Sequence, residues 1–386
     1  MPVQTVSLRK ISGRKRSPLA GSLLLASLIL GGALRLQPAR ADVPRDPYQQ
    51  DVTKNSAVIV WKTANALNGR AWLTGPDGTR FSASGGPGTF HKAFFTGLTI
   101  GTEYKYAVNQ APGKLFSSTL HTAPSSTAPH VTFAVWGDSG MGNDGQKAVA
   151  AQIEKFHPDF LVHTGDLIYP EGQGELLDPR FFQIYQPTLS KVSFWGALGN
   201  HDVMTQDGRP WLDNFVLPHN GPAGEDPGRE YSFNWGPAHF AVLDSDASVG
   251  EMKNIIAPWL EKDLKASHAT WKFVVFHHPP YTEGLHGDSD RTKPLLVPAI
   301  EAGGANVVLN GHDHDYERFV PINGITYIVT GEGGGPLYPR KTHRPICAIF
   351  DNKHFSFTAI SLDGNKLHLK QIAGGGQILD DWTITK

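Results

Sequence analysis

The sequence predicts a layered α/β protein preceded by an N-terminal β-sandwich domain, and two observations support this fold class. Residues 46–123 contain several short strand-like stretches separated by turns rich in Gly and Pro. From about residue 130 onward, continuous apolar strands alternate with helical stretches, which is typical of a sheet covered on both faces. The chain has 386 residues, which is enough for more than one domain.

The N-terminal domain is expected to contain strands at 57–62, 69–74, 90–96 and 103–108, with turns at 76–78 and 85–88. Trp61 in an early strand, followed by Leu98, Gly101 and Tyr104, resembles the pattern of a fibronectin type III domain. A polar segment with two prolines at 122–129 predicts a linker. We therefore expect one domain at 42–124 and a second at 125–386.

The second domain has a strand pattern interrupted by helices. Strands are expected at 131–136, 160–163, 194–197, 240–244, 273–276, 307–309 and 326–329, and helices at 146–156, 179–190, 257–266 and 294–301. The last segment, 355–386, returns to the alternation of a β-strand around a turn at 363–365.

The N-terminus has the pattern of a secretory signal. Basic residues at 9–16 precede an apolar stretch at 19–34, and Ala39-Arg40-Ala41 then offers a small-residue cleavage site. We expect residues 1–41 to be a cleaved signal peptide; an uncleaved membrane anchor is the alternative. After cleavage the protein would be secreted or periplasmic, without attachment to a membrane.

Composition excludes some classes of function. The formal net charge of −1 gives no basic excess, so we expect no nucleic-acid partner. Cys347 is the single cysteine, which excludes an intramolecular disulfide and a zinc site built from cysteines. We expect Cys347 to be a buried apolar residue rather than a nucleophile.

Five times, an apolar strand runs directly into a cluster of Asp, Asn or His. The clusters lie at 137–140 (GDSG), 165–169 (GDLIY), 199–202 (GNHD), 276–279 (FHHP) and 311–315 (GHDHD). One such Asp could merely cap a helix, but five clusters after five strands indicate a shared site. Carboxylate, amide and imidazole groups are ligands for metal ions, and they are more numerous than one ion needs. A carboxylate such as Asp166 can bridge two ions.

This series of motifs resembles the metallophosphoesterase signature, over residues 131–320. Most members have a His where this chain has Gly140, and Tyr169 supplies the replacement ligand. That combination resembles the purple acid phosphatases, whose two-domain members also have an N-terminal β domain. Further similarity lies in 231–233, 243–245, 311–318 and 331–334. The resemblance implies an αββα sandwich for the second domain.

The resemblance also implies a binuclear site. The first ion, Fe(III), would be held by Asp138, Asp166, Tyr169 and His314. The second ion, which is Zn, Fe(II) or Mn, would be held by Asp166, Asn200, His277 and His312. His278 should point away from its neighbour His277, and His163 is expected to pack in the interior rather than bind metal.

Three further residues are implied as catalytic. His201 would contact the phosphate or protonate the leaving group, and Asp202 would fix the tautomer of His201. His286 lies on a Gly-flanked loop where family members have a His that contacts the substrate.

The resulting hypothesis is an acid phosphatase that hydrolyses small phosphate monoesters by attack of a metal-bound hydroxide. A phosphodiesterase or nucleotide hydrolase that uses the same two-metal site is the alternative. A non-catalytic binding protein is a rival from another class, although no ligand is missing once Tyr169 is counted. The physiological substrate, the second metal and the oligomeric state stay open.

Overall fold

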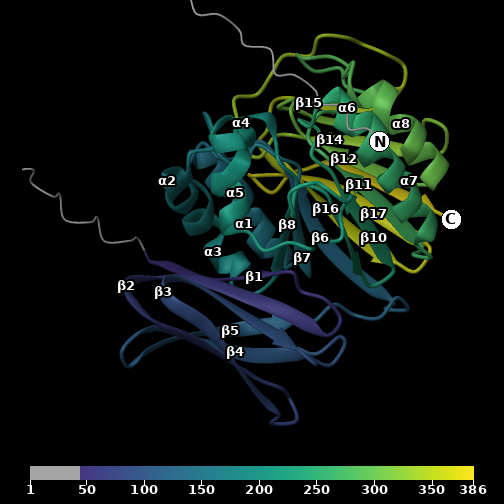
Figure 1. The fold of residues 1–386 in the computed structure, drawn as a ribbon. Coiled ribbons are helices and arrows are strands. Elements are labelled where there is room, and N and C mark those ends of the chain that lie inside the picture. The colour runs from purple at the N-terminus through teal and green to yellow at the C-terminus, as the bar shows by residue number, and fades with distance from the viewer. Residues whose placement is uncertain (1–43) are drawn as a thin grey trace, which may run out of the picture. The chain divides into compact units, whose positions relative to one another are not determined.

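The structure, a computed structural model, describes residues 44–386 (Figure 1). The predicted signal peptide at 1–41 lies outside the described residues. Within the described range, none of the helices is both long and apolar enough to cross a bilayer.

The N-terminal region is all-β, as predicted. Its strands are β1 (Arg45–Gln50), β2 (Ser56–Thr74), β3 (Arg80–Thr96), β4 (Glu103–Ala111) and β5 (Lys114–His121). The strands expected at 57–62 and 69–74 are both parts of β2, which pairs with β1 through its first half and with β4 through its second half. The 122–129 segment connects β5 to the next strand, so the domain boundary expected there stays a prediction.

The turn predicted at 85–88 is wrong, because these residues lie inside β3. The pairing of β3 with β2 shifts register there, which is a β-bulge. A Cβ atom on Gly85 would lie 2.5 Å from the buried Trp61 ring. Glycine in this stretch therefore makes room for a core side chain and does not mark a turn.

Two sheets form the rest of the protein. The first has the order β18-β17-β16-β6-β7-β8 and continues into the N-terminal strands through a single parallel pair, Gln49 with Ser193. The second has the order β15-β13-β14-β12-β11-β10-β9. The strands of the first are β6 (His130–Trp136), β7 (Phe160–His163), β8 (Ser193–Gly196), β16 (Ser356–Asp363), β17 (Lys366–Ala373) and β18 (Ile378–Thr385). Those of the second are β9 (Tyr231–Trp235), β10 (Ala238–Val242), β11 (Trp271–Val275), β12 (Val307–Asn310), β13 (Tyr316–Phe319), β14 (Thr326–Thr330) and β15 (Cys347–Asp351).

The longer helices lie on the outer faces of the sheets. The longer ones are α1 (Asp144–Phe156), α3 (Gln183–Leu189), α7 (Ala257–Ala266) and α8 (Thr292–Gly303). The shorter ones are α2 (Gly174–Leu177), α4 (Asn200–Met204), α5 (Arg209–Asn214) and α6 (Val249–Glu251). Figure 1 shows α1 and α3 on one outer face and α7 and α8 on the other. The helix predicted at 179–190 begins with a π-helical turn, Asp178–Phe182, and continues as α3.

Aromatic side chains join the two sheets in the middle. The Phe133 ring of the first sheet lies 5.3 Å from the rings of Phe240 and Phe273 in the second. On the far side of the second sheet, Leu260 of α7 and Ile300 of α8 belong to a separate apolar cluster. The order of layers is therefore helix, sheet, sheet, helix, and the predicted fold class, a β domain followed by an αββα sandwich, is confirmed.

Cys347 lies in β15 and is half-buried rather than fully buried. Its Sγ atom is 3.9 Å from Glu317 Oε2. Burial raises the pKa of this thiol to about 12, and the carboxylates of Glu317 and Glu283 add to the increase. The residue is therefore a poor nucleophile, in agreement with the prediction.

Candidate metal centre

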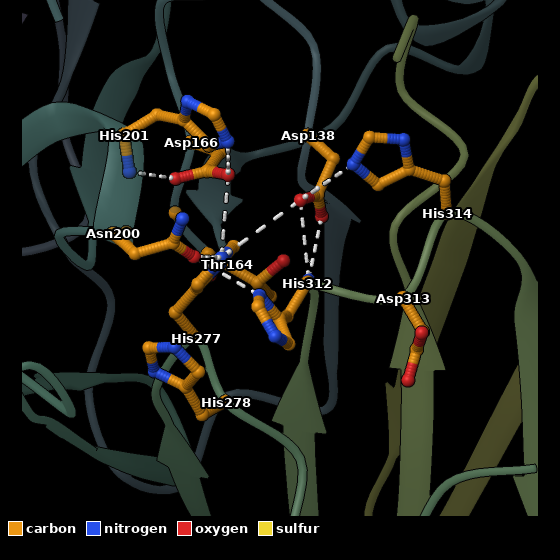
Figure 2. Close-up of polar contacts among 12 residues, drawn as sticks. Asp138, Thr164, Asp166, Asn200, His201, His277, His278, His312, Asp313 and His314 are labelled. Atoms are coloured by element: carbon orange, nitrogen blue, oxygen red, sulfur yellow. Dashed lines mark hydrogen bonds and ion pairs between the residues drawn. The ribbon is translucent and has the colours of Figure 1, made fainter. Parts of the chain in front are cut away.

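The polar clusters follow strands that run in parallel, so they meet at one edge of the sandwich. Strands β6, β7 and β8 are parallel neighbours, as are β10, β11, β12 and β14. Asp138, Asp166 and Asn200 come directly after strands of the first sheet, and His277 and His312 after strands of the second. Figure 2 shows these side chains pointing toward one another.

The backbone is strained where three of these residues leave their strands. Asp138 and Asp166 both have a φ of 55°, and His312 has a φ of 72°. Side chains other than glycine rarely occupy this left-handed region, and such residues cluster at functional sites. At these three positions the backbone adopts an unfavourable conformation that brings the donor atoms of the side chains together.

The Tyr169 hydroxyl stands between three predicted ligands of the first ion. Its oxygen lies 3.1 Å from Asp138 Oδ1, 3.1 Å from Asp166 Oδ2 and 2.8 Å from His314 Nε2. His314 Nδ1 donates to the Pro336 carbonyl at 2.7 Å, so its Nε2 presents a lone pair. One phenolic proton cannot satisfy three acceptors, whereas a cation accepts electrons from all four groups.

The ionisation of Tyr169 also requires a cation. Burial raises the pKa of this phenol well above its usual value, and the carboxylates of Asp138 and Asp166 raise it further. The phenolate form, which is the form that binds metal, is therefore stable only beside a strong positive charge.

The predicted ligands of the second ion surround the amide oxygen of Asn200. His277 Nε2 lies 3.1 Å and His312 Nδ1 3.0 Å from Asn200 Oδ1. His277 Nδ1 donates to the Thr164 carbonyl at 3.0 Å, which directs Nε2 toward Asn200 and toward Asp166 Oδ2 at 3.4 Å.

A proton or a metal ion must compensate the negative charge around His277. Burial alone would lower the pKa of His277, but the carboxylates of Asp166 and Asp138 outweigh it and raise that pKa to about 10. In the described part of the chain, the side-chain partners of these two carboxylates are imidazoles and a phenol. Donor atoms of Asp138, Asp166 and His277 lie within 4.8 Å of one another, as in a metal site. The seven predicted ligands therefore lie together in surroundings that suit cations, and their assignment to two ions that share Asp166 stays a prediction.

Comparison with known proteins agrees with this geometry. Residues 131–316 match the family model of the calcineurin-like phosphoesterases. Purple acid phosphatase 17 of Arabidopsis thaliana is 29% identical over 296 residues, which cover 68% of this chain and 87% of the relative. Purple acid phosphatase 7 of the same plant is 29% identical over 269 residues, which cover 60% and 78%. The chain is a purple acid phosphatase homologue.

The fold supports the same relationship. The structure of a purple acid phosphatase from yellow lupin seeds superposes with a TM-score of 0.78 at 19% identity and covers 89% of this chain and 74% of the lupin chain. Together with the matched phosphoesterase domain and the purple acid phosphatase relatives, this fold supports a metal-dependent phosphatase.

The structure corrects the predicted role of Asp202. Its carboxylate is buried and accepts hydrogen bonds from the backbone N–H groups of Leu167, Ile168 and Gly199, at 3.0–3.3 Å. It does not orient His201, whose Nδ1 instead donates to the Pro170 carbonyl. Asp202 thus ties the loop that carries Asp166 to the loop that carries Asn200. Burial raises the pKa of Asp202 to about 8, and the Asp166 charge adds to the increase.

His201 lies beside Asp166 at the candidate metal centre. Its backbone N–H donates to Asp166 Oδ1 at 2.8 Å, and its Nε2 lies 3.9 Å from Asp166 Oδ2. Since Nδ1 carries the proton given to Pro170, Nε2 is the nitrogen that faces the site. The side chain is 29% exposed, so a ligand can reach it.

Two further histidines lie near the centre, and only His163 has the predicted environment. His163 is buried and pairs with the Ser139 hydroxyl at 3.0 Å. Contrary to the prediction from the sequence, His278 does not turn away from His277: the two rings meet edge to face at a centroid distance of 5.1 Å, and the ring of His278 lies 4.3 Å from that of His312. Its Nδ1 pairs with the Ser245 hydroxyl at 2.9 Å. Burial, together with the charge of His277, lowers the pKa of each ring to about 3.

Sequence reasoning missed two residues beside the centre. Asp313 lies between His312 and His314 and holds the imidazole of His286, with Nδ1 2.9 Å from Oδ1. Tyr338 stacks on the His314 ring at a centroid distance of 4.0 Å. Asp313 was visible as the central residue of the GHDH motif, whereas Tyr338 lies in a segment without a recognisable pattern.

Proposed function

We propose that this protein is an exported acid phosphatase that hydrolyses small phosphate monoesters at a two-cation centre. The main support is the convergence of seven oxygen and nitrogen donors at one edge of the sandwich. These are Asp138, Asp166, Tyr169, Asn200, His277, His312 and His314. In this proposal residues 1–41 are removed on export to a secreted or periplasmic location.

The first position would hold Fe(III) and the second Zn, Fe(II) or Mn. Only a strongly charged ion would keep Tyr169 ionised against the neighbouring carboxylates, which favours a trivalent ion beside it. The second position, with Asn200, His277 and His312, offers fewer negative groups and suits a divalent ion. When bound, the pair supplies a deprotonated water as nucleophile and neutralises charge on the ester oxygens.

The protein residues would bind the ester and manage its protons. His201, held through its Nδ1 by the Pro170 carbonyl, presents Nε2 and donates a proton to the leaving oxygen. His286, held by Asp313, contacts the phosphate group from the opposite loop. Asp202 keeps the two ligand-bearing loops in register but does not contact the substrate.

The first experiment measures hydrolysis of p-nitrophenyl phosphate against pH, with and without tartrate, together with the visible absorbance of the metal-loaded protein. We expect an acid optimum, resistance to tartrate and a phenolate-to-iron absorption band that Tyr169→Phe removes. An alkaline optimum without the band would contradict the iron–phenolate centre and indicate a pair of divalent ions instead. Faster turnover of bis-p-nitrophenyl phosphate than of the monoester would replace the monoesterase by a diesterase.

His201→Ala tests the proton donor. The expected loss is roughly 10²–10⁴ in kcat for an ester with a poor leaving group, such as an alkyl phosphate, and much less for p-nitrophenyl phosphate. Equal losses for the two esters would contradict the role of His201 as proton donor.

If residues 1–41 are removed on export, the mature protein should begin at Asp42.

A further inference from the structure

The imidazole of His286 is placed beside the metal centre by a loop that follows β11. Its ring lies 4.1 Å from the ring of His312, between centroids, and the side chain is 39% exposed. Both its backbone N–H, at 3.0 Å, and its Nδ1, at 2.9 Å, contact Asp313 Oδ1. The proton therefore resides on Nδ1, and Nε2 is the nitrogen available to a ligand.

Asp313 itself is turned away from the metal ligands. Figure 2 shows its carboxylate directed away from the carboxylates of Asp138 and Asp166, although it lies between His312 and His314 in sequence. The side chain is fully buried. Its second oxygen, Oδ2, is 2.7 Å from the Thr282 hydroxyl, in the same loop as His286.

A second buried carboxylate, that of Glu317, binds the base of this loop. It accepts hydrogen bonds from the backbone N–H groups of Glu283, at 2.8 Å, and Gly284, at 3.2 Å, and from the Thr282 hydroxyl at 2.5 Å. That hydroxyl has a single proton, so it can donate to Glu317 or to Asp313, but not to both at once.

The loop lies directly against these acidic side chains. A Cβ atom on Gly284 would be 2.5 Å from Asp313 Cγ, so only glycine fits. On its other side, the Glu283 carboxylate binds Arg340 Nε at 2.8 Å and the Arg344 backbone N–H, which fixes the loop to the 338–344 segment. The buried base of the loop, Thr282 to Gly284, is thus held from two sides, and only Leu285 and His286 are exposed.

We propose that Asp313 and Glu317 are positioning residues, which together fix the 282–286 loop and direct Nε2 of His286 toward the phosphate group of a bound ester. This inference rests on the proposed function. The carboxylate–imidazole arrangement that the sequence predicts at Asp202 and His201 occurs instead at Asp313 and His286.

A double-mutant cycle tests the inference. We would measure binding of inorganic phosphate to the metal-loaded protein, and kcat and KM for p-nitrophenyl phosphate, in Asp313→Ala, His286→Ala and the double variant, with the metal content of each determined. Each single change should weaken phosphate binding roughly tenfold, the usual loss for a charge-assisted hydrogen bond. The double variant should be no weaker than His286→Ala, because Asp313 acts through His286.

Conservative variants separate orientation from folding. Asp313→Asn should retain most of the affinity, since its Oδ1 can still accept from His286 and its amide N–H can donate to the Thr282 hydroxyl. The ¹⁵N shifts of the His286 ring report the tautomer without reference to catalysis. They should show Nδ1 protonated in the unmodified protein and in Asp313→Asn, and a mixture of tautomers in Asp313→Ala or, if that variant does not fold, in Asp313→Ser, whose side chain is too short to hold the ring. Glu317→Gln leaves Asp313 in place, so it should weaken phosphate binding without changing the tautomer.

Asp351 provides a matched control. Asp351 Oδ1 contacts the backbone N–H of His354 at 3.1 Å and the ring Nδ1 of His354 at 3.0 Å. The side chain of His354 is 39% exposed, like that of His286. Asp351→Ala, the counterpart of Asp313→Ala, should leave phosphate binding unchanged.

Additive losses in the double variant, equal weakening by Asp351→Ala, or an unaltered His286 ring in Asp313→Ala would overturn the inference. The proposed function fails separately. If phosphate binds in a His286-dependent way but no ester is hydrolysed, the positioning role stands and the phosphatase assignment is lost.

Discussion

The two sheets of the sandwich contribute different chemistry to the metal centre. The first sheet supplies the oxygen donors, Asp138, Asp166, Tyr169 and Asn200, from the loops after β6, β7 and β8. The second supplies the imidazoles, His277, His312 and His314, from the loops after β11 and β12. Each proposed ion takes ligands from both sheets. Packed aromatic rings therefore join the sheets in the middle, and cations would join them at one edge.

The largest expected effect on activity comes from the oxygen donors of the first sheet. Asp166→Asn removes the charge of the carboxylate shared by both proposed ions and leaves its size unchanged. We expect activity on p-nitrophenyl phosphate to fall by more than roughly 10³-fold, because several kcal/mol of charge stabilisation is lost at both positions. Metal analysis should show less than two ions per chain. Retention of two ions and of activity would contradict the shared-ligand assignment.

The imidazoles supplied by the second sheet should make the stability of the metal-free protein depend on pH. The pKa of His277 is raised from 6.5 to about 10 by Asp166 and Asp138 against the effect of burial. The folded state therefore holds a proton that the unfolded chain releases above pH 6.5. This stabilisation is complete below pH 6.5 and is lost as the pH rises toward 10, by a few kcal/mol.

Urea unfolding of chelator-treated protein between pH 6.5 and 9.5 measures this loss. In His277→Asn the dependence on pH should be much flatter. An identical slope in the two proteins would mean that another group, such as Asp202, is responsible.

A smaller effect is expected from the backbone that supports His314. A Cβ atom on Gly335 would lie 2.5 Å from His314 Cε1. Gly335→Ala should displace this imidazole from Tyr169 and lower kcat roughly 10–100-fold, as for other residues that support a metal ligand. Gly324→Ala is the control for general backbone effects, because the space around Gly324 is open, although its positive φ of 83° adds strain. Unchanged kcat in Gly335→Ala would show that the loop adapts.

The smallest effect on activity is expected from the N-terminal strands. Gln49 Nε2 donates to the carbonyls of Ser190, at 2.9 Å, and Thr119, at 2.6 Å, next to the end of β8 that is remote from the metal centre. Gln49→Ala should lower the free energy of unfolding by about 1–3 kcal/mol, since two hydrogen bonds of a buried amide are lost. The kcat should not change. A fall in kcat without a fall in stability would indicate that these strands influence the centre.

The donor atoms could be predicted because their signals are local. A carboxylate, amide or imidazole directly after an apolar strand must lie at the strand's end, and parallel strands end at the same edge. The orienting partners could not be predicted in this way. Three of them are backbone carbonyls, of Thr164, Pro170 and Pro336, which have no signature in the sequence.

Asp202 shows a different limit. Its position next to His201 suggested a side-chain pair, but it is the third residue of α4, whose N-cap is Gly199. A short acidic side chain at this position turns back to the N-cap backbone, and the spacing of Gly199 and Asp202 is that of a capping box. Adjacency in sequence was therefore a weaker guide than position within the helix. In β3, likewise, the glycines at 85–88 suggested a turn. The packing of Gly85 against Trp61 could not be predicted, because it depends on a contact between residues far apart in the sequence.

The single thiol of the chain gives the loop that carries His286 a built-in reporter. Cys347 touches Glu317, and its raised pKa keeps it un-ionised at neutral pH, so it should react slowly with iodoacetamide. Any change that withdraws Glu317 or opens the loop should accelerate alkylation. Since no other cysteine competes, the mass of the intact protein over time would follow motion next to the active centre without any added label.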